Sequence, residues 1–206
     1  MVEPVFGRWG PTEVMERVLD GTWAEVVDGM GLIEPVSIAF SGTSAAITGL
    51  GSVEFSAVSS LSLNGVFSSD FDNYMIVIRH LHSATDIVEL FWRLRLAGVD
   101  ASGSNYTRQQ LSANGTAVEG VRTSSATSTR LGSTSNLQRS GDVVYFYGPS
   151  LAQPTAMRAL DVNGFTNATI TDQAATHSVS TAYDGLTVFP NTGSISGRVA
   201  VYGMVK

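Results

Sequence analysis

A two-residue period in the placement of apolar side chains constrains the fold of this chain more than any other feature of its sequence. From about Ile33 onward, apolar and polar residues alternate in short segments, and segment 88–96 is the clearest of them. There Leu90, Trp92 and Leu94 alternate with mostly charged residues. Successive side chains of a β-strand point to opposite faces of its sheet, so the pattern predicts strands with one buried face.

Turn signals separate these segments and define the expected fold class. The dipeptides Asn64-Gly65, Asn114-Gly115 and Asp184-Gly185 are typical of tight turns between antiparallel strands. About ten strands are predicted in this way. They lie at residues 52–67, 72–81, 87–98, 106–113, 118–123, 142–148, 155–164, 177–182, 186–189 and 195–206. With 43% apolar and only 15% charged residues, the chain is predicted to be all-β, a jelly-roll-like antiparallel β-sandwich.

Two of the predicted strands indicate which faces of the sheet are buried. The segment DNYMIVIRHL is apolar on both faces, so we expect it to be covered on both sides, inside a sandwich or against another subunit. The segment ISGRVAVYGMVK places Val199 and Val201 on one face and Arg198 and Tyr202 on the other. It is therefore expected to be a half-buried strand locked into the sheet.

The first forty residues differ from the rest. In PTEVMERVLD apolar residues recur four positions apart, as on one face of a helix, and TWAEVVDG begins a second piece with Thr22 and Glu25 at capping-box positions. Each piece is too short to be stable alone. We therefore predict a helical or extended anchoring segment at residues 1–40, followed by the sandwich at residues 41–206. The residues expected to make the attachment are Val14, Met15, Val18, Leu19, Trp23 and Val26.

Residues 120–141 are polar and rich in hydroxyl groups. Such a stretch is either disordered or a long surface loop around a modest strand. Because strands are predicted on both sides of it, the sequence favours the loop.

Charge and residue types exclude several functions. The formal net charge is −6, and the pairs Arg93 with Arg95 and Arg122 with Arg130 are too sparse for a basic patch, so no nucleic-acid partner is expected. The chain has no cysteine, which excludes disulfides and thiolate chemistry. No apolar run approaches the roughly 20 residues of a membrane span, and the start lacks a signal-peptide pattern, so no membrane insertion is expected.

His80 and His82 are the pair that most resembles metal ligands, because positions i and i+2 of a strand share a face. Asp86 or His177 could supply a third ligand, but the spacing fixes none. We therefore predict no metal site and no other cofactor, and we expect both histidines at a strand end that faces solvent or another subunit.

Carboxylate pairs for glycoside hydrolysis must face each other across a cleft. The candidates Asp70, Asp72, Asp161 and Asp184 all lie in turn-like contexts, where aspartate is common because it bonds its own backbone. No nucleophile or phosphate-loop motif is present. The chain is therefore expected not to be an enzyme.

Aromatic side chains favour carbohydrate binding, since sugar rings stack on them while short polar groups bond the hydroxyls. Trp92 lies on the apolar face of its segment and is expected in the core. The candidate ligand-binding residues, which lie near loops or polar faces, are Tyr106, Tyr145, Tyr147 and Tyr183.

Three segments, in order along the chain, resemble a known family. They are SLSLNGVFSSDFDNYMIVI, LFWRLRLAG and AYDGLTVFPNTGSISGRVAVYGMVK. They are similar to segments of bacteriophage virion proteins described as minor tail, tail-fibre or head-fibre proteins, whose C-terminal domain is a jelly-roll-like β-sandwich. The matching positions are Val66–Tyr74, Leu94–Gly98 and Tyr183–Gly203, and the resemblance covers residues 50–206.

The resemblance implies a virion protein, assembled in the host cytoplasm and exposed on the particle surface, that forms a homotrimer and joins other virion proteins through its N-terminal segment. The leading hypothesis is a tail-fibre or minor tail component whose sandwich binds a host-surface glycan. The alternative is a head-fibre or capsid decoration protein with a purely structural role. A glycan-degrading enzyme is the third hypothesis, and two close carboxylates in a cleft would favour it.

Overall fold

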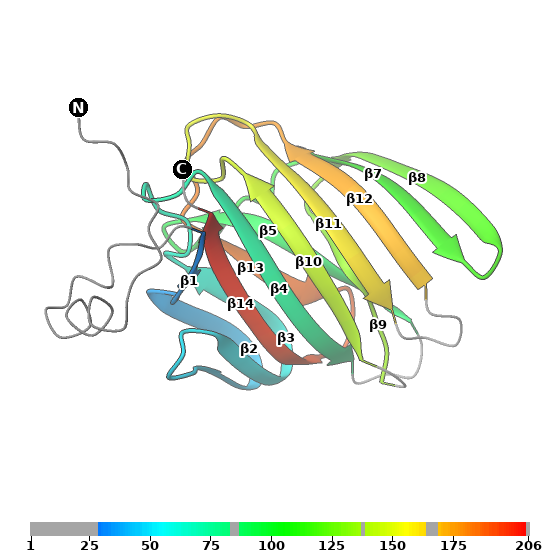
Figure 1. Cartoon of the computed structure of the whole chain (residues 1–206), viewed down its shortest axis with the longest axis horizontal. Helices are drawn as coiled ribbons and strands as arrows, with labels where there is room; N and C mark the ends of the chain where they lie inside the picture. Colours follow the sequence, from blue (N-terminus) through cyan, green and yellow to red (C-terminus); the bar gives the residue numbers. More distant parts are fainter. Residues whose placement is uncertain (1–28, 83–86, 137–138, 164–168, 205–206) are drawn as a thin grey trace, which may run out of the picture.

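The computed structural model describes residues 29–82, 87–136, 139–163 and 169–204, and these residues form fourteen antiparallel strands and no helix (Figure 1). The strands are β1 (Met30–Ile33), β2 (Ser37–Ile47), β3 (Val53–Asn64), β4 (Asn73–His82), β5 (Val88–Leu96), β6 (Val99–Asp100), β7 (Tyr106–Asn114), β8 (Ala117–Ala126), β9 (Thr129–Thr134), β10 (Ser140–Tyr147), β11 (Thr155–Asn163), β12 (Thr169–His177), β13 (Gly185–Pro190) and β14 (Ile195–Met204). No described segment is a helix long and apolar enough to cross a membrane. The all-β prediction is confirmed.

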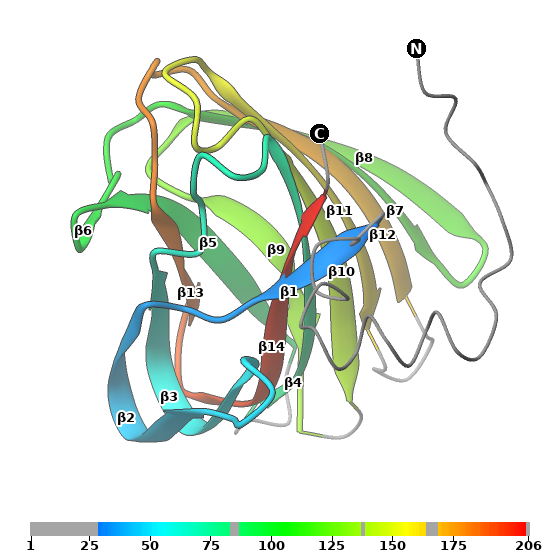
Figure 2. The same ribbon diagram turned by 60° about the vertical axis from the view of Figure 1, so that its left-hand side comes forward.

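All strands belong to one sheet that curls over its own core. The order along its main path is β6-β5-β13-β3-β14-β4-β10-β11-β12-β7-β8. Off this path, β1 pairs with β14, β2 with β3, and β9 with β5. Figure 2 shows β5 and β13 on one side of the interior and β10, β11 and β12 on the other. The curl therefore brings strands together that lie far apart in the sequence.

The core is built from the inward residues of both sides. Trp92 of β5 is 1% exposed and packs edge-to-face on Phe146 and Tyr106, with ring centroids 4.7 and 5.7 Å away. Its predicted core position is confirmed. Such edge-to-face contacts suit the opposite charges of ring edge and ring face.

Strand β4 is covered on one face rather than two. Tyr74, Ile76 and Ile78 are buried, whereas Val77 on the other face is 37% exposed. The chain itself therefore covers DNYMIVIRHL on one side only, and cover of the other side by another subunit stays a prediction. β-Branched residues suit a pleated strand on either face, so apolar character alone does not show that both faces are buried.

The segment GVFSSDFDNY forms the predicted turn before β4. The Tyr74 hydroxyl accepts the N–H of Ser68 at 2.7 Å and donates to the Ser68 carbonyl at 2.8 Å, while the Ser68 hydroxyl donates to Asp70 at 3.0 Å. A buried ring thereby holds the turn through its hydroxyl.

Segment 195–206 was predicted to be a half-buried strand within the sheet, and β14 confirms this for residues 195–204. It pairs with β4 along its whole length, with β3 at Ile195–Val199 and with β1 at Val201–Met204. Val199 and Val201 are buried, as the two-residue period predicts. A side chain at Gly203 would overlap the ring of Phe71, which explains the glycine at this position.

The sheet begins before the boundary predicted at residue 40. β1 pairs with β14, and β2 pairs with β3 from Ser37 onward. Ile33 and Ile38 pack against the core, so β1 and the start of β2 are part of the sheet. The helical pieces and the six attachment residues predicted between Val14 and Val26 lie outside the described residues.

Two further segments differ from the sequence-based expectation. The strand predicted at residues 177–182 lies earlier, as β12, and ends at His177. The polar stretch 120–141 is not a loop around a modest strand: within its described part, it supplies most of β8, all of β9 and the start of β10. Threonine is a good strand former, which lets such a hydroxyl-rich stretch join the sheet.

Candidate binding site

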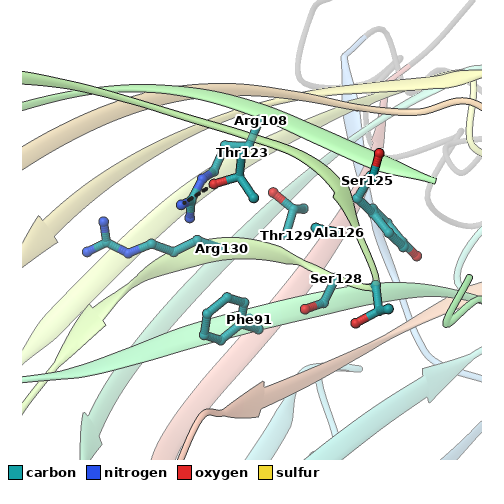
Figure 3. Close-up of a pocket in the computed structure, with 10 residues that line it drawn as sticks. Phe91, Arg108, Thr123, Ser125, Ala126, Ser128, Thr129 and Arg130 are labelled. Atoms are coloured by element: carbon teal, nitrogen blue, oxygen red, sulfur yellow. Dashed lines mark hydrogen bonds between the residues drawn. The ribbon is translucent and has the colours of Figure 1, made fainter. Parts of the chain in front are cut away.

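The polar stretch forms one wall of a pocket of about 360 Å³ (Figure 3). Its other walls come from Phe91 of β5 and from Tyr106 and Arg108 of β7. The remaining lining residues are Thr123, Ser125, Ala126, Thr127, Ser128, Thr129 and Arg130. The volume lies within the range usual for small-ligand sites.

A bulge shapes the wall that β8 contributes. The pairing of β7 with β8 shifts between Tyr106 and Arg108, so that β8 carries an extra residue, and Ser125 has a φ of 53°. Bulges turn side chains away from the regular alternation and often lie beside functional sites. Beyond the bulge the chain reverses into β9, which pairs with β5 and places Arg130 opposite Phe91.

The guanidinium groups of Arg108 and Arg130 lie on the same side of the pocket, to the upper left of Phe91 in Figure 3. Arg130 donates to Gln110 Oε1 at 2.9 Å, to the Gly132 carbonyl at 3.2 Å and to the Ser133 hydroxyl, and its Nε lies 3.5 Å from Glu89 Oε1. Arg108 donates to the Thr123 hydroxyl at 3.2 Å, and its buried Nε has no partner.

The environment of Arg108 disfavours its charge. Burial lowers the pKa of Arg108, and the nearby Arg130 lowers it further, against a smaller opposing effect of Glu89. Two cations therefore face the same space with one carboxylate beside them. In a chain of net charge −6, this is a local concentration of positive charge.

Aromatic and hydroxyl groups complete the pocket. The rings of Phe91 and Phe189 are stacked at 6.0 Å, and the guanidinium of Arg93 lies 4.6 Å from the centre of Phe189. Arg93 also donates to the carbonyl of Thr127 at 3.0 Å, which ties the β8–β9 connection to β5. The pocket can offer a ring face, hydroxyls and cations to a ligand.

A buried acidic pair lies beneath β9. Asp142 of β10 and Asp161 of β11 are directly opposite in the register and are 2% and 1% exposed. His80 Nε2 lies 2.5 Å from Asp142 Oδ2, and the N–H of Ser133 donates to Asp161 at 3.2 Å. A side chain at Gly132 would overlap both carboxyl groups, so the glycine lets β9 cover them.

Burial and the neighbouring Asp142 raise the pKa of Asp161 to about 8, although Arg130 and the N–H of Ser133 oppose the change. Both effects favour the neutral, protonated form of Asp161. Neither aspartate lines the pocket, and both are shielded from solvent. The sequence placed Asp161 in a turn, which is wrong, and the pair is not the open carboxylate cleft that a glycoside hydrolase needs.

The four predicted tyrosines do not form one site. Tyr106 is fully buried, with its hydroxyl accepting the N–H of Leu94 and donating to the carbonyl of Ala101. Burial raises its pKa. Tyr183 is 6% exposed, and both rings pack on His177. The expectation of exposed side chains is wrong for these two, because their rings pack in the core. Tyr106 nevertheless contributes to the wall of the pocket, whereas Tyr183 does not line it.

Tyr145 and Tyr147 lie together on the outer face of β10, away from the pocket. Tyr145 is partly exposed and Tyr147 is 44% exposed. Their alternation with the buried Val144 and Phe146 sets this orientation. They stay candidates for contacts on the outer face only.

His80 and His82 share a face, as predicted, but it is the inner one. They are 0% and 2% exposed, and His82 Nε2 lies 2.7 Å from the carbonyl of Thr192. The expectation of a solvent or subunit surface is wrong, because both side chains are buried on the inner face, where Asp142 and the carbonyl of Thr192 are their partners. Among the described residues, no group of three or more potential ligands that could hold a metal ion is found.

Sequence reasoning missed Phe91, Arg108 and Arg130 as pocket residues. The sequence predicted a strand at residues 118–123, but it gave no signal that this strand would continue to Ala126 or that β9 would follow it.

No protein-family model and no curated protein sequence matches the chain. Among solved structures, it is similar to domain 4 of AbnA, a GH43 extracellular arabinanase from Geobacillus stearothermophilus, solved with arabinotriose, at 11% identity over 86% of this chain and 84% of that one, with a TM-score of 0.32. It is also similar to the CBM22-1 xylan-binding domain of Paenibacillus barcinonensis Xyn10C, at 8% identity over 87% and 88%, with a TM-score of 0.21. These likenesses are too low to indicate a function.

Proposed function

We propose that this chain is a non-enzymatic phage virion protein that binds a host-surface glycan through the pocket between β5, β7, β8 and β9. The pocket carries the binding part of the proposal, since it joins a ring face to several hydroxyls and two cations. The sequence resemblance over residues 50–206 supports the virion part. We also propose that the curled sheet is a jelly-roll-like β-sandwich.

The proposal includes the assembly inferred from the resemblance. The protein is a homotrimer and is exposed on the particle surface, either in the tail fibre or as a minor tail component. Residues before β1 attach it to other virion proteins.

The direct test measures binding of the full chain to an array of bacterial surface glycans, with a variant that fills the pocket. Ser128→Trp places an indole in the pocket and should abolish binding. Ser124→Trp is the matched control, because Ser124 is exposed on the neighbouring strand and does not line the pocket. Equal binding by both variants would contradict the proposed site, and no binding by the folded wild type would contradict the function.

A second function, a purely structural head-fibre or capsid decoration role, is favoured by a separate observation. Val162, Ile170 and Val118 form a row across the outer face of β11, β12 and β8, joined through Ala113 of β7, and are 55%, 58% and 67% exposed. Exposed apolar rows are typical of protein contacts. Sedimentation of wild type and Ile170→Lys tests this surface: a trimer lost in the variant supports it, and a monomeric wild type contradicts the trimer.

A further inference from the structure

We propose that the pocket recognises an acidic glycan and binds its anionic group, a carboxylate or a phosphate, between Arg108 and Arg130. This inference rests on the proposed glycan-binding function and adds the class of ligand. The charge of the ligand is specified neither by the sequence resemblance nor by the volume of the pocket.

Arg108 differs from the other arginines that the structure describes. Of those that are not fully exposed, Arg93, Arg95, Arg130 and Arg198 each have a carboxylate within 4.0 Å. Arg108 has none among the described residues. A partly buried cation without a counterion costs stability, so its retention in a pocket wall points to an anion supplied from outside.

Arg95 shows what a structural arginine looks like in this protein. It donates to Asp100, Ser62, Thr187 and Asn64 and to the carbonyl of Gly98, so its hydrogen-bonding capacity is filled by the chain itself. Arg108 has one hydrogen bond, to Thr123, within the described part of the chain, and its buried Nε is unpartnered. The guanidinium fork is therefore available for a ligand, and its geometry suits carboxylates and phosphates.

The second cation is held in place but is only partly neutralised. Three hydrogen bonds position Arg130, and Glu89 is 45% exposed in its side chain at 3.5 Å from it. Beneath it, burial and the neighbouring Asp142 raise the pKa of Asp161, which favours its neutral form and weakens its compensation of the Arg130 charge. The repulsion between Arg108 and Arg130 is relieved when an anion lies between them.

The groups around the cations favour a sugar acid over a bare ion. The hydroxyls of Thr123, Ser125 and Ser128 and the ring of Phe91 line the same pocket. They match the hydroxyls and the apolar face of a sugar ring. The acid group is then carried on a glycan, either as a uronic acid or as a phosphodiester.

The test is calorimetric titration of the full chain with four probes of one length: oligogalacturonate, oligogalactose, a glycerol-phosphate oligomer and a neutral glycerol-based polyether. We expect one or both acidic probes to bind and both neutral ones to fail, with affinity falling as NaCl rises. The two acidic probes distinguish a carboxylate from a phosphate source. Arg108→Gln should weaken acidic binding about 10- to 100-fold, the range expected for lost charge-assisted hydrogen bonds.

Three comparisons separate recognition from folding. Arg122→Gln removes an exposed arginine from the outer face of β8, beside Thr123, and should leave affinity unchanged. Arg108→Gln should not lower the melting temperature of the free protein, because it removes a repulsion rather than an ion pair. Arg108→Lys keeps the charge without the fork and should retain an intermediate affinity.

The outcomes also separate this inference from the proposed function. Neutral probes that bind as tightly as acidic ones, with Ser128→Trp inactive and Arg108→Gln unaffected, would leave glycan binding intact and overturn the acidic class. Acidic binding that survives both Arg108→Gln and Ser128→Trp would place the anion elsewhere and overturn the site. Failure of the folded wild type to bind every probe and every glycan of the array would overturn both.

Discussion

Replacing Asp161 by asparagine should remove a pH dependence of stability that the wild type shows between about pH 4 and pH 8. The folded pKa of Asp161 is raised from 3.8 to about 8. Folded protein therefore retains a proton that the unfolded chain releases above its ordinary pKa. The stabilisation is fully present below the pKa of the unfolded chain, 3.8. It is lost progressively as the pH rises from there through the pKa of the folded protein, about 8. Asparagine cannot ionise, so the variant lacks this loss.

The expected magnitude follows from one proton. Where the folded chain binds one proton more than the unfolded chain, the free energy of unfolding falls by about 1.4 kcal/mol per pH unit. Between pH 5 and pH 7 the wild type should lose about 3 kcal/mol relative to Asp161→Asn.

The assay is urea unfolding of both proteins at pH 5, 6 and 7, because titrating groups remote from the Asp142–Asp161 pair contribute equally to the two curves. Asp172→Asn is the control: its carboxylate accepts from Arg158 on the exposed face, and this bond lowers the pKa of Asp172. Its effect on stability should be the same at all three pH values. A constant difference between wild type and Asp161→Asn would refute a protonated acid beneath β9.

Three other predictions address the core, the cover of the acidic pair and the N-terminal segment. Trp92→Ala should destabilise the fold by about 3–5 kcal/mol in the same assay, and unchanged stability would contradict its core role. Gly132→Ala should cost about 1–3 kcal/mol, because its methyl group overlaps Asp142 and Asp161, and a neutral result would mean that β9 can shift. Deletion of residues 1–28 should preserve the cooperative melting transition but prevent incorporation into particles, since the described sheet starts at Met30. Loss of that transition would show that those residues belong to the core.

Local pattern predicted the elements of the fold well where one strand face is apolar. The alternation around Trp92 and the turn at Asn114-Gly115, where Gly115 has a φ of 59°, correspond to β5 and to the β7–β8 hairpin. Periodicity predicts such elements because backbone geometry couples neighbouring residues directly. It failed at β9, where polar residues occupy inward positions and the pattern resembles that of a loop.

The site could not be predicted because its residues come from strands that are distant in sequence. Phe91, Arg108 and Arg130 meet through the pairing of β5 with β9 and of β7 with β8. Asp142 and Asp161 face each other because β10 and β11 pair in that register. An inward aspartate or histidine has the same local signature as one that faces solvent.

The sequence by itself determined that the chain is all-β, where most strands lie and which residues of each strand share a face, because these follow from a period of two. Only the tertiary structure decided which faces are covered, which arginines have a counterion and which carboxyl groups are buried together. Burial and pairing depend on the register between distant strands, and that register is set by the packing of the whole core rather than by any local stretch of residues.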